Sequence, residues 1–397
     1  MKDLSKYASL MARAGEDGAV PTALFSSPGR IEICGNHTDH QCGRVIAAAI
    51  DLDTIAAACP REDGLIRVCS EGYEPFSISI DDADCCETHP GTPASITAGL
   101  IKAFIGAGYK PGGFDAYVSS SVGVGSGVSS SSSFELLIAS IINLFYCGGR
   151  VTAEEMAAFS KYAENEYFGK PSGMMDQLAC ALGGISFIDF KDPDNPYTER
   201  LCFDFEEHGY SIFVVDSGAN HADMTGLYAS IPEEMRSVAG YFGAEHLRQV
   251  NENDFYTSLN KLRSLLGDRA VLRTIHFFEE NRRVEQMSAA LKAGQTDDFL
   301  KEVRASGISS WMYLQNVIPP GNTQALAVAL AVIDRELKGR GAVRVHGGGF
   351  AGTALAFVPG ENSASFIESV DEILGNGSCR SVHIRQEGAL GFSLTRT

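Results

Sequence analysis

Hydrophobic and polar positions alternate differently in the two halves of this chain, and the pattern predicts strands first and helices next. In the first third, short and often β-branched apolar runs are separated by turn residues, which is typical of antiparallel strands. These runs cover residues 31–34, 45–50, 54–59, 65–70, 76–80 and 114–119. Helical periodicity follows at 93–105, 129–145 and 153–168. Thr152 and Glu155 predict a capping box at the start of the last helix.

The second half of the chain mixes helices and strands without a strict βαβ order. After a strand at 183–190, the sequence KDPDNP marks the predicted boundary between domains 1–195 and 196–397. A strand at 210–216 precedes three or four helices that run through Leu337, with Asn322 as an N-cap and Gly339 as a stop. Further strands are predicted at 342–346, 353–358 and 381–386. The pattern therefore predicts an α+β protein.

A run rich in glycine and serine, VGVGSGVSSSSSFELLIASIINLF, starts at Val122. Three glycines and five consecutive serines lead directly into an apolar pattern of helical period. A helix that starts behind a flexible loop presents unpaired N–H groups and the positive end of its dipole, an arrangement that binds phosphate. No lysine follows Gly127, so the run is not a P-loop. A flexible linker is the alternative, which the immediate onset of the helix disfavours.

Composition and charge restrict the partners. The 397 residues, 44% hydrophobic and 21% charged, suffice for two cores. A net charge of −18 repels nucleic acid and anionic membranes, so neither is expected as a partner. A phosphorylated ligand must then be bound by backbone amides and Mg²⁺ more than by basic clusters. The N-terminus lacks the apolar core of a signal peptide, and the sequence contains no apolar stretch of 18 residues. The cysteines are scattered, without the paired spacing of metal ligands. We therefore expect a cytoplasmic protein with reduced thiols.

A polar cluster follows the first predicted strand, in SSPGRIEICGNHTDHQCG (residues 26–43). Asn36, His37, Asp39 and His40 fall within five positions, a density typical of a small-ligand pocket. Amide and carboxylate groups bond sugar hydroxyls, and Arg30 can stabilise anionic charge. A zinc site is a weaker alternative, because this spacing is not an established zinc signature. An Asx turn with solvated histidines is another.

Two later segments also carry candidate chemistry. In YAENEYFGKPSGMMDQLAC (residues 162–180), Glu164 lies on a helix and Asp176 follows a PSG turn. This pair suits one Mg²⁺ ligand and one base or positioning carboxylate. The alternatives are an exposed helix face, favoured for Glu166, and an N-cap role for Asp176. In VRVHGGGFAGTALAFV (residues 343–358), a glycine-rich turn between strands allows close approach of a ligand or of the facing domain.

In this order and at these separations, the four segments resemble the GHMP-type small-molecule kinases, and within them the galactokinases. GRIEICGNHTDH is similar to the N-terminal signature, GVGSGVSSSSSFE to the phosphate loop, PSGMMDQ to the catalytic-aspartate segment and GGGFAG to the third motif. The likeness extends from about Ser26 to Leu390. It implies a ribosomal-S5-like N-terminal domain and a ferredoxin-like C-terminal domain, with the active site between them.

The resemblance also implies roles for individual residues. Arg30 would lie near the transferred phosphoryl group, and Asp176 would face the sugar's anomeric hydroxyl as base or orienting group. Ser131, or a neighbouring serine, and Glu164 would hold Mg²⁺. The sugar would contact Asn36, His37, Asp39, Gly173 and Tyr228, with Asp39 placed for two hydroxyls. The phosphates of ATP would contact Gly123, Gly125, Ser126, Gly127, Val128, Ser129, Ser130 and Ser131.

Departures from the family pattern bear on the identity of the sugar more than on the use of ATP. Asn36 stands where galactokinases usually carry Glu, at a position expected to meet the sugar's 6-hydroxyl. An amide donates as well as accepts, so a substrate altered at that carbon is conceivable. His40 replaces the usual Tyr, and Gly123 stands where Pro often opens the phosphate loop. The segment 304–317 lacks an acidic pair common in the family.

The expected reaction is transfer of the terminal phosphoryl group of ATP to the anomeric hydroxyl of galactose, giving galactose 1-phosphate and ADP. A kinase for galactosamine, N-acetylgalactosamine or galacturonate is the first alternative, because of Asn36. A non-catalytic sugar sensor is the second. An isoprenoid or homoserine kinase is disfavoured by the polar cluster at 36–39. The expected partners are the sugar and ATP, and the expected state is a monomer or weak homo-oligomer.

Overall fold

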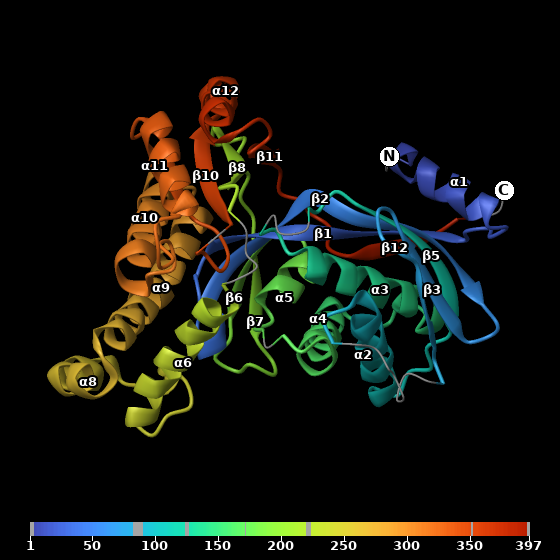
Figure 1. Cartoon of the computed structure of the whole chain (residues 1–397), viewed down its shortest axis with the longest axis horizontal. Coiled ribbons are helices and arrows are strands. Elements are labelled where there is room, and N and C mark those ends of the chain that lie inside the picture. The colour runs from blue at the N-terminus through green and yellow to red at the C-terminus, as the bar shows by residue number, and fades with distance from the viewer. Residues whose placement is uncertain are drawn as a thin grey trace.

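A computed structural model describes residues 4–81, 90–123, 127–170, 172–219, 224–350 and 352–394. Two β-sheets, each with helices packed on it, lie next to each other in the molecule (Figure 1). None of the helices within these ranges combines the length and the apolar character that crossing a membrane requires.

The first sheet has eight strands, with the order β12-β1-β2-β5-β3-β4 and with β6 and β7 attached to β2. Its strands are β1 (Ala23–Cys34), β2 (Arg44–Arg61), β3 (Leu65–Ser70), β4 (Phe76–Ser79), β5 (Gly113–Ser120), β6 (Ile185–Asp189), β7 (Tyr197–Leu201) and β12 (Leu390–Ser393). The antiparallel pairing of β1 with β2 shifts register between Pro28 and Arg30. Because such irregularities redirect side chains, this one contributes to aiming Arg30.

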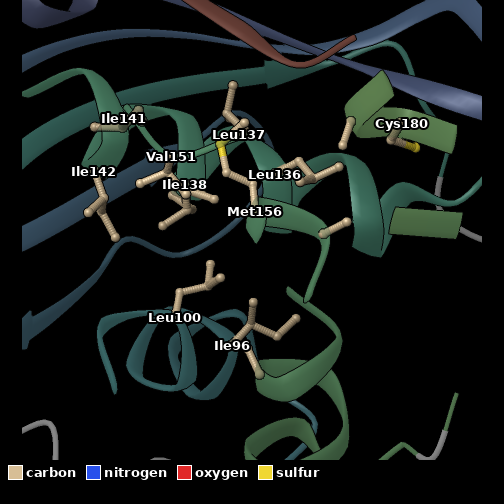
Figure 2. Packing of buried hydrophobic residues seen from close by; sticks show 14 of the residues in the cluster. Ile96, Leu100, Leu136, Leu137, Ile138, Ile141, Ile142, Val151, Met156 and Cys180 are labelled. Atoms are coloured by element: carbon tan, nitrogen blue, oxygen red, sulfur yellow. The ribbon is translucent and has the colours of Figure 1, made fainter. Parts of the chain in front are cut away.

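Four helices cover one face of this sheet, and α1 (Ala8–Glu16) covers the other (Figure 1). The four are α2 (Pro93–Gly106), α3 (Ser130–Tyr146), α4 (Ala153–Tyr162) and α5 (Met175–Leu182). The centre of this layer is α3, whose Leu137 and Ile138 are fully buried among side chains of α2 and α4 such as Leu100 and Met156 (Figure 2). Close packing on several sides fixes the helix, and therefore fixes where its N-terminus lies.

The second sheet is antiparallel, with the order β11-β8-β10-β9. Its strands are β8 (Tyr210–Asp216), β9 (Ala342–Val345), β10 (Thr353–Pro359) and β11 (Cys379–Val382). One face packs on α11 (Ala325–Leu337) and α12 (Ser363–Leu374), and the other on α9 (Asp268–Lys292) and α10 (Thr296–Ser309). A further cluster joins α9 to α6 (Thr225–Tyr241), α7 (Glu252–Thr257) and α8 (Leu259–Leu266).

Short helical turns complete the fold, and two of them are π-helices. The 3₁₀ turns are η1 (Ser5–Tyr7), η2 (Asp39–Gln41), η4 (Leu247–Gln249) and η6 (Gly360–Asn362). The π-helices are η3 (Ala163–Phe168), which extends α4, and η5 (Ser310–Leu314), which extends α10. Because π-helices are rare and often lie at functional sites, these two segments are candidates for positions near the active site.

The α+β class is confirmed, and the differences from the predicted elements are local. The capping box is confirmed, since Thr152 and Glu155 bond each other reciprocally. The predicted N-cap at Asn322 is wrong: α11 starts at Ala325 behind Gln324, because the apolar face begins only there. The last predicted strand, at 381–386, corresponds to β11, which begins and ends a few residues earlier in the chain. The predicted strands at 45–50 and 54–59 are one strand, β2, which continues through its exposed polar middle.

The sheets do not separate cleanly at the predicted domain boundary. The KDPDNP segment connects β6 to β7, and both strands belong to the first sheet. The C-terminal strand β12 also returns to that sheet and pairs with β1. A boundary between residues 195 and 196 therefore stays a prediction.

A buried ion pair joins the two sheets. Arg344 on β9 donates to the Glu32 carboxylate on β1 at 2.6 Å and to the Glu32 carbonyl at 3.2 Å. Burial raises the pKa of Glu32, although the charge of Arg344 opposes that rise. The Nε2 atom of His346 accepts a hydrogen bond from the Glu32 amide at 3.0 Å. These bonds fix β9 of the second sheet against β1 of the first.

We predict that Arg344→Met lowers the free energy of unfolding by about 3–5 kcal/mol, because it leaves Glu32 buried without its counter-charge. Urea denaturation measures this loss. The matched control is Arg340→Met, whose exposed pair with Glu361 is expected to contribute about 0.5 kcal/mol or less. Equal stability of the two variants would contradict the role of the buried pair.

Candidate active site

A cleft of about 270 Å³ lies where the two parts of the chain meet. The described residues that line it are Arg30, Gly127, Ser129, Ser130, Ser131, Lys170, Asp176, Tyr228, His346, Gly347, Gly348, Gly349, Gly352 and Thr353. Residues from the signature strand, the serine run, the catalytic-aspartate segment and the third motif therefore converge on one space, as the sequence predicts.

Arg30 and Asp176 form a two-point ion pair at the wall of the cleft. Nε of Arg30 lies 2.7 Å from Oδ1 of Asp176, and Nη2 lies 2.6 Å from Oδ2. The remaining Nη1 donates to the Gly127 carbonyl at 2.6 Å. Burial acts to raise the pKa of Asp176, but the Arg30 guanidinium and a hydrogen bond from Ser129 outweigh it and hold that pKa below its usual value. Asp176 is therefore an oriented, ionised acceptor.

The N-terminus of α3 opens into the same cleft. Ser129, in the left-handed conformation at φ 60°, precedes the helix, and its side chain does not cap it. The amides of the first turn lack partners within the helix, so they are available to an anion. Val128 is buried rather than cleft-lining, and its carbonyl accepts a bond from the Arg30 amide at 3.1 Å. A Cβ on Gly29 of β1 would lie 2.7 Å from that carbonyl, so the close approach of the loop to β1 requires glycine at position 29.

The other predicted phosphate-loop positions are not all described. Gly125 and Ser126 lie outside the described residues. Gly123 is half-buried and is not among the described lining of the cleft. Ser132 and Ser133 are buried in α3, as expected for residues that only begin the helix.

Glu164 lies on the π-helix η3, and its carboxylate is enclosed by donors. Oε1 accepts from Lys170 Nζ at 2.8 Å and from Ser131 Oγ at 3.4 Å. Oε2 accepts from Gln177 Nε2 at 2.9 Å and from the Ser172 hydroxyl. The two residues predicted to hold Mg²⁺, Ser131 and Glu164, are therefore neighbours. Glu166 on the same segment is exposed, which agrees with the favoured alternative for it.

Oxygen donors of this kind fit Mg²⁺. A hydroxyl and one carboxylate are a typical protein contribution when phosphates and water supply the remaining ligands. Within the described ranges, no group of three or more His, Cys, Asp or Glu side chains is placed to hold a metal ion by itself. The fit therefore depends on a nucleotide that brings its own oxygens.

Asp39 packs tightly on Gly173 in the predicted sugar site. A Cβ on Gly173 would lie 2.0 Å from Oδ2 of Asp39, so only glycine fits there. Burial, with lesser contributions from the charges of Asp176 and Glu32, raises the pKa of Asp39 to about 6, while His37 opposes the rise. The structure thus brings Asp39 and Gly173 into direct contact.

His37 reaches the third motif from the left-handed conformation, at φ 57°. Burial lowers the pKa of His37, and its Nε2 lies 3.1 Å from the Gly348 carbonyl, so we assign the proton to Nε2. Nε2 of His40 lies 3.4 Å from Nδ1 of His37. The Tyr228 hydroxyl donates to the Gly349 carbonyl at 2.8 Å. Only glycine fits at position 348, since a Cβ there would lie 2.5 Å from the Tyr228 ring.

Asn36 is fully buried beneath this turn. Its Nδ2 donates to Glu32 at 3.0 Å and to the Gly347 carbonyl at 2.6 Å, and its Oδ1 accepts from Asn316 at 2.8 Å. These bonds tie the third motif and the segment after η5 to β1. A direct contact between Asn36 and a sugar stays a prediction, and it requires one of these bonds to open.

Sequence reasoning missed Lys170, His346 and Thr353 as cleft residues. His346 is neutral, because burial lowers its pKa far below the usual value, and its Nδ1 lies 3.0 Å from the Thr353 hydroxyl. Lys170 could have been predicted from the sequence, because a lysine directly before the PSG turn is close to the candidate residue Asp176. His346 and Thr353 flank the glycine-rich turn, but only the packing of that turn on Gly127 brings them to the cleft.

Comparisons with known proteins agree with this geometry. The family described as "GHMP kinases N terminal domain" matches residues 95–184, and the "Galactokinase galactose-binding signature" matches residues 14–60. A galactokinase of Streptomyces coelicolor is 30% identical over 89% of this chain and 89% of its own length. A galactokinase of Enterococcus faecalis is 29% identical over 90% of both chains.

Solved structures show the same fold. The crystal structure of Lactococcus lactis galactokinase complexed with galactose matches with a TM-score of 0.83 and 24% identity, over 97% of this chain and 99% of that one. A mevalonate kinase matches with a TM-score of 0.64 and 15% identity, over 92% and 99%. The predicted two-domain GHMP kinase fold is confirmed. Because the Streptomyces relative is similar over nearly the whole length, the chain belongs to the galactokinase family of the GHMP kinases.

Proposed function

We propose that this protein is an ATP-dependent sugar 1-kinase that converts galactose and ATP to galactose 1-phosphate and ADP. The observation that carries the proposal is the Arg30–Asp176 pair beside the N-terminus of α3. An oriented carboxylate that can accept from an alcohol thereby lies next to a group of amides that can bind phosphate. The names of the relatives support galactose as the alcohol.

Phosphoryl transfer requires alignment and charge compensation more than covalent chemistry by the protein. The amides at the start of α3 would bind the phosphates of ATP, and Arg30 would offset charge that develops on the transferred group. Ser131 and Glu164 would hold Mg²⁺, which supplies charge neutralisation between the phosphates when it is bound. The anomeric oxygen forms a bond to the terminal phosphorus as the bond from that phosphorus to ADP breaks.

The low pKa of Asp176 favours an orienting role before proton transfer. A carboxylate paired with Arg30 at two points is a weak base, so it can hold the sugar hydroxyl in line without deprotonating it early. The proton would leave the hydroxyl as the new bond to phosphorus forms, with Asp176 as its first acceptor. We therefore propose that Asp176 first orients the hydroxyl and then accepts its proton.

The sugar would bind beside the third motif, with Asp39 bonding two of its hydroxyls and His37 and Gly173 alongside. We place the enzyme in the cytoplasm, consistent with free thiols at the eight cysteines in the described part of the chain. We expect a monomer or a weak homo-oligomer that takes only the sugar and ATP as substrates.

We predict that Asp176→Asn loses about 10²–10⁴-fold in turnover, because the sugar hydroxyl loses its charged acceptor. Release of ADP at saturating galactose and ATP measures this loss. Since the variant also weakens a buried ion pair of Arg30, its Tm is expected to fall, and turnover is compared at a temperature where both proteins are folded.

Asp194→Asn, on the exposed turn between β6 and β7, is the matched control and is expected to keep full turnover. Near-normal turnover by Asp176→Asn would remove Asp176 from the mechanism.

We predict that galactose is the preferred substrate in a panel with galactosamine, N-acetylgalactosamine and galacturonate. Asn36, the residue that motivates the alternatives, already uses both amide hydrogens and its oxygen in protein bonds, and as a neutral side chain it supplies no charge to pair with a galacturonate carboxylate. Comparison of kcat/KM for each sugar with ATP decides the question. A higher value for another sugar would refute galactose, and sugar binding without ADP release would favour the sensor alternative.

A further inference from the structure

Lys170 is joined to Glu164 through both its main chain and its side chain. Gly169, in the left-handed conformation at φ 84°, ends η3 and reverses the chain. The Lys170 amide then donates to the Glu164 carbonyl at 3.1 Å, and its ammonium donates to the Glu164 carboxylate at 2.8 Å. The ammonium therefore lies at the position where the predicted Mg²⁺ ligand faces the cleft.

The cations that line the cleft differ in what they can still bind. Among the described lining residues, Arg30 and Lys170 are the two cationic side chains. All three guanidinium nitrogens of Arg30 already donate, two to Asp176 and one to Gly127. The Lys170 side chain is 57% exposed, and an ammonium has three donors, of which one is directed at Glu164. Lys170 is thus the more exposed and the less constrained of the two cations, and its ammonium can reach a further anion.

Glu164 cannot take another partner while Lys170 stays in place. Its Oε2 is held by Gln177 and Ser172, and its Oε1 faces Lys170 and, more distantly, Ser131. A cation that binds Glu164 beside Ser131 would repel the ammonium and release it toward the cleft. Phosphate oxygens at the N-terminus of α3 would then offer the ammonium another anionic partner in the same cleft.

We propose that Lys170 is a nucleotide-phosphate-binding residue, which neutralises Glu164 in the empty cleft and binds the phosphates of ATP in the loaded one. This inference rests on the proposed kinase function and deepens it. In a chain of net charge −18, such a residue keeps an acidic site ready for a polyanion. The ammonium exchanges one anionic partner for another, so the site does not hold an uncompensated charge in either state.

Calorimetric titration of the full chain with a non-hydrolysable ATP analogue and Mg²⁺ tests the proposal. Lys170→Met is expected to weaken binding of the analogue about tenfold, the loss of one charge-assisted contact, and to leave the affinity for galactose within about twofold. Lys170→Arg, which keeps the charge, is expected to recover part of the affinity. Lys170→Gln serves as the neutral variant if Lys170→Met does not fold.

Lys191→Met, at the exposed turn between β6 and β7 and outside the described lining of the cleft, is the matched control and should bind both ligands like the wild type. Unchanged affinity of the neutral variants for the analogue would overturn the proposal, and so would an equal loss for analogue and galactose, which indicates a structural role. If the wild-type protein binds no nucleotide, the proposed function fails, and the inference fails with it.

Discussion

The ion pair between Arg30 and Asp176 is the interaction on which the rest of the site depends. It joins the signature strand β1 to the first turn of α5, and through Gly127 it also fixes the loop that precedes α3. Because both charged groups are oriented at two points, the carboxylate faces the cleft in one geometry. The buried core around α3 fixes that helix in place, and it therefore determines where the amides at the helix N-terminus point.

The second sheet contributes the glycine-rich turn that lines one side of the cleft. This turn is bonded by Asn36, His37 and Tyr228. Gly348 and Gly349 carry no side chain because a Cβ there would collide with Tyr228 and Asn316 respectively. The buried Glu32 on β1 is bonded by Arg344 on β9 and by His346, which directly follows that strand. Because charge desolvation offsets much of the attraction in a buried pair, we infer that this one serves to place the sheets relative to each other. The cleft is consequently shaped by contacts between residues that lie about 300 positions apart.

Local patterns in the sequence predicted what depends on local chemistry. The capping box at Thr152, the strand at 210–216 and the helix behind the serine run follow from side-chain periodicity and hydrogen-bonding preferences. Asn36 illustrates the limit, because its spacing predicted an open ligand contact, whereas a bond to nearby Glu32 and two long-range bonds, to Gly347 and Asn316, enclose it. Lys170 and His346 were missed for the same reason. Their roles arise from Gly169 and from packing between the sheets, which periodicity does not encode.

In the proposed mechanism, the terminal phosphate of a nucleotide and a sugar hydroxyl meet between the start of α3 and Asp176. A crystal structure of the protein with galactose and a non-hydrolysable ATP analogue tests this most directly. The account predicts phosphate oxygens on the amides at Ser129–Ser131 and the anomeric hydroxyl about 2.6–3.2 Å from the Asp176 carboxylate. A nucleotide bound away from the N-terminus of α3, or a sugar whose anomeric hydroxyl faces away from Asp176, would contradict it.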